Sequence, residues 1–508
     1  MDAFKQIKYS VILLLFSVFL TSCMVGPDFH TPKEPALKRY TSSPLPKKTV
    51  GTSGLDGKPQ RFLTSKTIPR EWWKLFHSKE LNQLIQVGIA NSPNIASARA
   101  SLLEAKENLY AEIGSGLFPT ISASLGGERQ RASNASIGVS DTNIFNLFNA
   151  SVTVTYTPDV FGGIRRQIES LQAQVDNQRY ELIATYLSLT ANITTTAITI
   201  ASLQDQINAT NELIKMEKQY LDIVKQQYRL GGVSEASVLS QESTLAQTQA
   251  TLPPLQQSLS QNRHALAVLV GAFPSNMPHP KLTLNQLTLP ANIPVTLPSS
   301  LVRQRPDVLA AEATLASASA QIGVATANLF PQFTLGATYG WTGLVFSTLF
   351  NPNNKVWDYS GEVTQTVFAG GSLFAKRRAA IDAYNQSLAQ YQQTVLQAFQ
   401  NVADSLRAVQ HDAETLRAQK RATVAAYQSM ILTKDQFQLG GVDYLSLLTA
   451  QQQYQQARLS LVQAQAARLS DTAALFQALG GGWWNTDGID KQRCKKTCVR
   501  NATHEKPL

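Results

Sequence analysis

Two long stretches of the chain place apolar residues in steps of three, four and seven positions, which is the spacing of helices that pack along one another. They span residues 163–229 and 371–438, and neither contains a proline. A continuous helix of either length would be on the order of 100 Å long. The pattern therefore predicts two helices that are too long for an ordinary globular domain.

Each of these helical patterns ends in the same four residues, Leu-Gly-Gly-Val, and a further helical pattern follows. Because paired glycines allow a left-handed stop and a tight turn, the chain is expected to form two helical hairpins with Gly-Gly tips. The expected return helices span 234–271 and 443–479. The first contains Pro253 and Pro254, which predict a kink or break, whereas the second has no proline there.

Four segments between the helices alternate apolar and polar residues with a period of two. These predicted strands lie at 120–125, 150–157, 333–341 and 356–367. One apolar face with aromatic residues and one polar face are typical of a transmembrane β-barrel, and a soluble antiparallel sheet is the alternative. The Ser-, Asn-, Gly- and Thr-rich segments 129–147 and 342–355 are expected to be external loops. An open sheet cannot lie in lipid with unpaired edges, so strands from other chains must complete it.

The two halves of the chain carry similar segments in the same order. Pro93 aligns with Pro306 at an offset of 213 residues, and the glycines of the two tips align at an offset of 209. This period is too long for the unit of a solenoid. The sequence therefore predicts a mainly α fold with a small β part, built from two tandem structural repeats.

The predicted organisation has six parts, because the segments that flank the helices are irregular and rich in Pro, Gly and Lys. The parts are a signal peptide (1–22), an N-terminal irregular segment (23–75), a first repeat of helix, two strands and long hairpin (76–271), a linker (272–300), a second repeat of the same kind (301–480) and a C-terminal tail (481–508).

The N-terminus carries a targeting signal. Lys5 and Lys8 precede an apolar run at 11–20, which is a secretory signal pattern and is too short for a spanning helix. Leu-Thr-Ser before Cys23 is similar to a bacterial lipobox, which implies cleavage before Cys23 and acylation of its thiol and new amino terminus. Met24 follows instead of Asp, which favours the outer membrane. An ordinary signal peptide with an incidental cysteine is the alternative.

Composition and charge exclude several function classes. The net charge is +10, but the basic residues are scattered and no basic stripe with interleaved aromatics occurs, so no nucleic-acid partner is expected. The six histidines lie apart, without a triad or paired ligands, and no phosphate loop is present, so no enzyme is predicted. Cys494, Cys498 and His504 fit no standard zinc ligand set. No metal or other cofactor is expected beyond a covalent lipid on Cys23, and a Cys494–Cys498 disulfide is left open.

Several segments together resemble the TolC-like outer-membrane factors, over about residues 23–484. The matching segments are "REWWKLFHSKELNQLIQVGIANSPNI", "LFPTIS", "RQRPDVLAAE", "LFPQFTLGATYGW", "VFAGG" and "GGVDYLSLLTAQQQYQQARLSLVQA". The most similar branch is that of lipoprotein outer-membrane subunits of RND-type multidrug efflux pumps. The resemblance implies a homotrimer that is lipid-anchored in the outer membrane of a Gram-negative bacterium. It would have a 12-stranded β-barrel, a periplasmic α-barrel and an irregular equatorial belt.

The resemblance also implies a function. The chain would be a passive exit duct of a tripartite efflux system, joined to a periplasmic adaptor protein and an inner-membrane transporter, and carrying small molecules such as drugs. Two alternatives are the outer-membrane duct of a type I protein secretion system and a static coiled-coil lipoprotein that tethers envelope layers. The amphipathic strands argue against the tether, which needs no barrel, and lipidation favours efflux over protein secretion.

The hairpin tips are expected to dock the adaptor. The residues concerned are Gly231, Gly232, Val233, Gly440, Gly441, Val442 and Asp443. Their glycines, valines and small polar residues would present backbone and apolar spots to a partner. The alternative is that the glycines serve the turn alone.

The second hairpin resembles the inner helix pair that closes the periplasmic mouth in this family. Relatives commonly carry carboxylates one and two turns past the tip, and these positions here fall on Ser446 and Thr449, which do not ionise. Leu445 lies on the same stretch, and three copies around an axis could form an apolar constriction. Phe437 matches a family position that often bears an aromatic gate residue. Asp443 is taken as the one acid near the mouth, and its alternative role is to cap a helix N-terminus.

Overall fold

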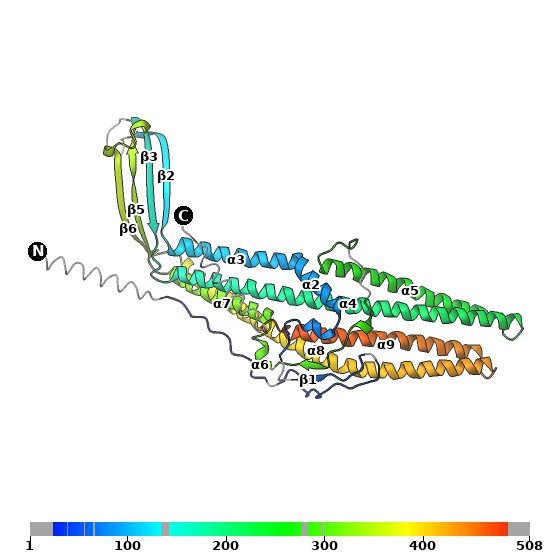
Figure 1. Ribbon diagram of the computed structural model, residues 1–508. Coiled ribbons are helices and arrows are strands. Elements are labelled where there is room, and N and C mark those ends of the chain that lie inside the picture. Colours follow the sequence, from blue (N-terminus) through cyan, green and yellow to red (C-terminus); the bar gives the residue numbers. More distant parts are fainter. Residues whose placement is uncertain are drawn as a thin grey trace. The chain divides into compact units, whose positions relative to one another are not determined.

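The computed structural model describes residues 24–37, 39–54, 56–63, 67–133, 142–276, 282–296 and 298–485 (Figure 1). The chain divides into two compact units. The first comprises the described part of Met1–Pro32 with Ala100–Arg179 and Ala310–Gln392, and the second comprises Lys33–Arg99, Tyr180–Leu309 and the described part of Gln393–Leu508.

The first unit contains a four-stranded antiparallel sheet in the order β2-β3-β5-β6 (Figure 1). Its strands are β2 (Thr120–Ser133), β3 (Thr142–Tyr156), β5 (Gln332–Gly343) and β6 (Lys355–Thr364). The register places Tyr339 opposite Val152 on one side and Trp357 on the other, all on one apolar face. On the opposite face the hydroxyls of Thr153 and Thr338 lie 3.2 Å apart. The predicted sheet with one apolar and one polar face is confirmed.

Both edges of this sheet lack a partner strand among the described residues. Every residue of β6 is exposed, and the side chains of Trp357 and Tyr359 are 68% and 77% exposed. At the other edge Ile121 of β2 is 70% exposed. Unpaired backbone at both edges, with bare aromatic rings on β6 and a bare isoleucine on β2, is what further strands would cover.

Three predicted strand boundaries were wrong. β2 continues to Ser133 and β3 already begins at Thr142, so most of the loop expected at 129–147 is paired strand. β6 ends at Thr364 instead of 367. In the outer halves of β2 and β3 the alternation of apolar and polar residues is lost, because Arg129, Arg131 and Asn146 occupy positions on the apolar face. Backbone pairing continues where the side-chain pattern does not.

Both predicted hairpins are present and their bounds agree with the expectation to within two residues. The helices are α4 (Gly163–Arg229), α5 (Glu235–Leu269), α8 (Ser372–Gln438) and α9 (Tyr444–Ala478). The break expected in α5 was wrong, since the helix continues through Pro253 and Pro254. Thr248 and Leu259 are buried on either side of the two prolines, and this packing offsets a local cost of about 3 kcal/mol per proline.

The flanking segments are more regular than expected. β1 (Arg61–Leu63) and β4 (Asn292–Pro294) come from the two segments predicted to be irregular, and they pair in parallel. The second unit also contains η1 (Trp72–Phe76), α2 (Lys79–Asn91), η3 (Leu284–Gln286) and α6 (Pro298–Leu301). The buried ring of Trp72 lies 5.6 Å from that of Phe476, so η1 packs against the C-terminal end of α9.

Two further helices, α3 (Pro93–Leu117) and α7 (Pro306–Ala327), each begin at a proline and lead towards the sheet strands. They are the aligned helices of the two repeats. Residue 92, before the first of these prolines, has an extended backbone, as the residue before a proline usually does. The first repeat therefore holds two helices, α2 and α3, where one was expected.

Candidate functional site

The two hairpin tips have the same backbone geometry. The first glycine of each pair is left-handed, with φ of +74° at Gly231 and +75° at Gly440. The amide of the second glycine donates to a carbonyl in the last helical turn, Gly232 to Gln227 and Gly441 to Gln436, each at 2.8 Å. This arrangement satisfies the end of the long helix and reverses the chain.

Leucine is the most exposed apolar residue at each tip. Leu230 and Leu439, which precede the glycine pairs, are both 87% exposed. The sequence-based choice of docking residues left them out, although both belong to the shared Leu-Gly-Gly-Val. The glycines are exposed and Val233 and Val442 are half-buried. Each tip therefore offers one bare leucine beside accessible backbone.

Behind the tips, one apolar cluster joins four helices of the second unit. Its buried members are Val224 of α4, Val238 of α5, and Tyr444 and Leu448 of α9. Phe437 of α8 packs against them, with its ring centroid 5.7 Å from that of Tyr444. In the single chain the Phe437 ring therefore packs between the two hairpins. Its role in a gate stays a prediction.

A buried polar network lies beside this cluster and was not anticipated. Gln241 is fully buried, accepts a hydrogen bond from the Tyr444 hydroxyl and donates to the Glu217 carbonyl at 3.3 Å. The Thr248 hydroxyl donates to the Glu217 carboxyl at 2.9 Å. Burial raises the pKa of Glu217 to about 7, against the opposing effect of the Thr248 hydrogen bond. Polar residues on a long helix look alike in sequence whether they face water or another helix, so no signal identified these.

Three of the four proposed gate residues, Leu445, Ser446 and Thr449, lie together. A shallow pocket of about 410 Å³ at the end of the second hairpin contains Asp443, Leu445, Ser446 and Thr449 in its lining, with hydroxyl and amide side chains of α8 opposite them. Leu445 is 65% exposed. The Thr449 hydroxyl donates back to the Leu445 carbonyl at 2.9 Å. The structure thus brings these four side chains to one accessible face, and leaves Phe437 outside the pocket lining.

Asp443 caps the N-terminus of α9. Its carboxylate accepts hydrogen bonds from the Ser446 amide at 2.9 Å and from the Ser446 hydroxyl at 2.5 Å, and these bonds lower its pKa. The capping role is therefore confirmed. The expectation that Asp443 is the one acid near the mouth was wrong, since Asp435 is exposed in the last turns of α8.

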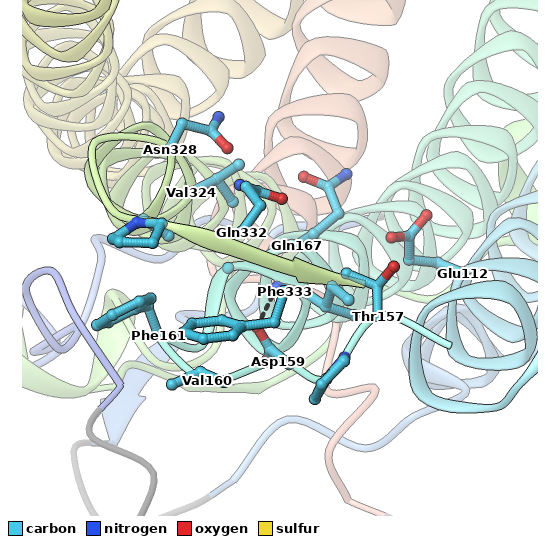
Figure 2. Close-up of a pocket in the computed structure, with 15 residues that line it drawn as sticks. Glu112, Thr157, Asp159, Val160, Phe161, Gln167, Val324, Asn328, Gln332 and Phe333 are labelled. Atoms are coloured by element: carbon cyan, nitrogen blue, oxygen red, sulfur yellow. Dashed lines mark hydrogen bonds between the residues drawn. The ribbon is translucent and has the colours of Figure 1, made fainter. Parts of the chain in front are cut away.

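A second pocket, of about 240 Å³, lies in the first unit where β3 leads into α4 (Figure 2). Asp159 is one of its lining residues. Its Oδ1 accepts from the Ile164 amide, and its Oδ2 accepts from the Arg165 amide and, at 3.1 Å, from the Arg165 Nε. The ring of Phe161 stacks on that of Phe330 at 4.7 Å. Figure 2 shows polar side chains of Glu112, Gln167, Asn328 and Gln332 along the other side. The acid is already used in helix capping, so this pocket is a structural corner.

No group of three or more His, Cys, Asp or Glu that could hold a metal occurs among the described residues. The candidate residues Cys23, Cys494, Cys498 and His504 lie outside the described part of the chain.

The chain is similar to known outer-membrane proteins along nearly all of its length. The sequence model of one family, outer membrane efflux protein, matches residues 84–272 and 297–481, which confirms the two repeats. The toluene efflux pump outer membrane protein TtgC of Pseudomonas putida is 26% identical over 489 residues, with 96% of this chain and 98% of that protein covered. The pyoverdine export outer membrane protein OpmQ of the same species is 28% identical, covering 82% and 88%.

Among solved structures, the outer-membrane channel OprN superimposes with a TM-score of 0.81 at 26% identity, covering 91% of this chain and all of that one. The Campylobacter jejuni CmeC outer membrane channel gives the same TM-score at 19% identity, and shares the fold.

Proposed function

Because the chain belongs to the outer membrane efflux protein family, we propose that three copies form the exit duct of a tripartite efflux system. The duct passively conducts small molecules across the periplasm and outer membrane. The family is one of outer-membrane channels, and this chain is localised to the outer membrane.

The single observation that carries the trimer is the four-stranded sheet with two bare edges. A sheet can face lipid only when its edges are paired, which requires a closed barrel. Pairing β2 of one copy with β6 of the next would give 12 strands from three copies, within the range of known barrels. The polar face, which carries Asp358, Glu362 and the paired Thr153 and Thr338, would line the lumen.

The hairpins supply the periplasmic part of the duct. The exposed leucine and backbone of each tip suit a periplasmic adaptor protein, which in turn joins an inner-membrane transporter that supplies the energy. Gly231, Gly232, Val233, Gly440, Gly441, Val442 and Asp443, now with Leu230 and Leu439, are the proposed contacts. The pocket with Leu445, Ser446 and Thr449 is the proposed periplasmic gate.

The proposed cargo is a class of small molecules. The names of TtgC and OpmQ specify toluene and pyoverdine respectively for those proteins. The gate face of this chain is lined mainly by hydroxyl, amide and apolar groups, which discriminate little between solutes. Selection among cargoes would then lie with the transporter, and the duct would be passive.

The same chain is proposed to be a lipoprotein, with lipid on Cys23 after cleavage of residues 1–22. Mass spectrometry of the mature N-terminal peptide tests this, with diacylglyceryl and amide-linked acyl masses expected on Cys23. Cleavage elsewhere with an unmodified Cys23 would contradict it.

The experiment that tests the duct is affinity purification of the tagged chain from its native envelope in mild detergent. Co-purification of an adaptor with a proton-driven inner-membrane transporter is the expected result, together with greater retention of small toxic compounds in cells that lack the chain. An ATP-driven exporter as the sole partner would favour the type I protein secretion duct. Monomers without any transporter would favour a structural tether.

A further inference from the structure

A buried arginine holds the first residues of the proposed mature chain. Arg166, in the first turn of α4, has a side chain that is 1% exposed. Its guanidinium donates to the carbonyl of Val25 at 3.1 Å and to the carbonyl of Gly26 at 3.3 Å. It also pairs at 2.7 Å with Asp28, and at 2.7 Å with Glu169 of its own helix. Charge-assisted bonds of this kind are among the stronger hydrogen bonds in proteins.

Close backbone contacts complete this site. A Cβ on Gly26, which has φ of +94°, would lie 2.4 Å from the Cα of Gly323 on α7. A Cβ on Gly323 would in turn lie 2.7 Å from the Arg166 side chain. The strap made by residues 24–28 therefore lies directly on α7 and Arg166, at a distance that only glycine permits.

The first residues of the strap pack directly against the strand-to-helix corner, which is the segment between β3 and α4. The Val25 amide donates to the Phe161 carbonyl at 3.2 Å, and a Cβ on Gly162 would lie 2.5 Å from the Met24 side chain. Figure 2 shows Phe161 at this corner, on the wall of the pocket described above. Cys23 directly precedes Met24 in the sequence, so the strap begins at the residue bonded to the proposed lipidation site.

We propose that residues 24–28 and Arg166 form an anchor clasp, which fixes the lipid on Cys23 at the strand-to-helix corner and so sets that corner at the membrane surface. Arg166 is a positioning residue in this proposal. A flexible linker would let the lipid and the sheet move independently, whereas the clasp makes lipid insertion and barrel insertion one event. The proposal rests on the lipoprotein assignment of the proposed function.

A purely structural role for Arg166 makes a different prediction. If the arginine only stabilised the start of α4, its loss would lower assembly by the same factor with or without lipid. If it acts through the lipid, its loss should matter in the lipidated protein alone. Two changes that act through one step are not additive, and this difference can be measured.

The first experiment compares wild type, Arg166→Gln, Cys23→Ser and the double variant for the fraction of full-length chain that reaches the outer membrane as trimer. We expect each single variant to lower this fraction several-fold, and the double variant to be no lower than Cys23→Ser alone. Arg165→Gln is the matched control, because Arg165 lies in the same helical turn as Arg166 but pairs with Asp159 and not with the strap. Multiplication of the two single effects in the double variant would overturn the proposal.

The second experiment leaves the clasp intact and adds slack. A spacer of about eight Gly and Ser residues between Cys23 and Met24 should lower the trimer fraction to that of Cys23→Ser, although mass spectrometry still finds lipid on Cys23. The same spacer between His30 and Thr31, beyond the clasp, should leave the trimer fraction at the wild-type value. Wild-type assembly with the first spacer would overturn the clasp. An unmodified Cys23 in the wild-type protein would instead overturn the lipoprotein assignment, and the clasp with it.

Discussion

The Tyr444 hydroxyl donates a hydrogen bond to the side-chain oxygen of Gln241, and this bond joins the return helix of the second hairpin to that of the first. Both side chains are buried, Gln241 completely. A buried carbonyl oxygen that loses its donor costs about 1–3 kcal/mol. This hydroxyl therefore adds one buried hydrogen bond to the apolar cluster that joins the two hairpins near their tips.

Tyr444→Phe should lower the free energy of unfolding of the purified protein by about 1–3 kcal/mol. The ring and its packing against Phe437 would remain, so the loss reports the hydroxyl. Chemical denaturation followed by circular dichroism measures it. Tyr427→Phe, at a half-exposed ring on α8, is the control and should be near neutral. Equal stability of Tyr444→Phe and wild type would show that water replaces the bond.

Glu217 should make the packing of the hairpins depend on pH. Its ordinary pKa of 4.5 is raised to about 7 in the folded chain by burial. Below pH 4.5 the carboxyl is protonated in both states and has no effect. As pH rises from about 4.5 to about 7 the unfolded chain ionises first, so stability falls, by at most about 3 kcal/mol.

Glu217→Gln should remove this dependence and raise stability at neutral pH, with little change below pH 4.5. Thermal unfolding measured between pH 4 and pH 8 tests it. Glu212→Gln, at an exposed carboxylate that pairs with Arg458, is the control. A pH profile that is identical in wild type and Glu217→Gln would contradict the assignment.

The tip glycines allow docking to be separated from folding. Gly440 has φ of +75°, where valine is strained, whereas Gly441 has no left-handed backbone and a Cβ there meets the Gln436 carbonyl at an ordinary 3.5 Å. Gly441→Val should therefore keep trimers in the outer membrane while efflux, measured as drug susceptibility, is lost. Gly440→Val should lower the trimer yield itself. Normal efflux by Gly441→Val would show that this tip does not dock the adaptor.

Leu445→Ala should raise the single-channel conductance in planar bilayers. The side chain is exposed in the gate pocket, and an apolar ring at a constriction opposes the entry of water and ions. Leu432→Ala, at an exposed leucine outside that pocket lining, is the matched control. Unchanged conductance in Leu445→Ala would place the narrowest point elsewhere.

Thr449→Asp should give the channel a conductance that falls with added divalent cations and recovers at acid pH. A carboxylate at this exposed position would stand beside Ser446, and three copies would form a charged ring. Strong divalent block already present in wild type, and removed by Asp435→Asn, would show that the acid in the last turns of α8 guards the mouth in its place.

The sequence predicted the long helices closely because their ends are chemically marked. The Gly-Gly pairs after Arg229 and Gln438 stop both helices in the same way. The outer halves of β2 and β3 could not be predicted, since Arg129 and Arg131 remove the alternation while backbone pairing continues. The continuity of α5 through Pro253 depends on tertiary packing, which local pattern does not contain.

The candidate site was predictable in part. Capping by Asp443 follows from its place after Gly-Gly-Val and three residues before Ser446. Exposure of Leu445 and Thr449 on one face follows from helical spacing. The Glu217, Gln241 and Tyr444 network was not predictable, because it requires three separate helices to meet. The hydrogen bonds from Arg166 to residues 25–28 join positions far apart in the sequence, so the sequence pattern did not predict them either.

The bare edges of β2 and β6 have a genetic consequence. In a ring of three, every copy completes two seams, so one copy that cannot pair at an edge opens the barrel for the other two. A cell that makes such a variant and the wild-type chain in equal amounts would hold about one intact ring in eight. Mutations at either edge should therefore be dominant, whereas loss of the whole gene should be recessive.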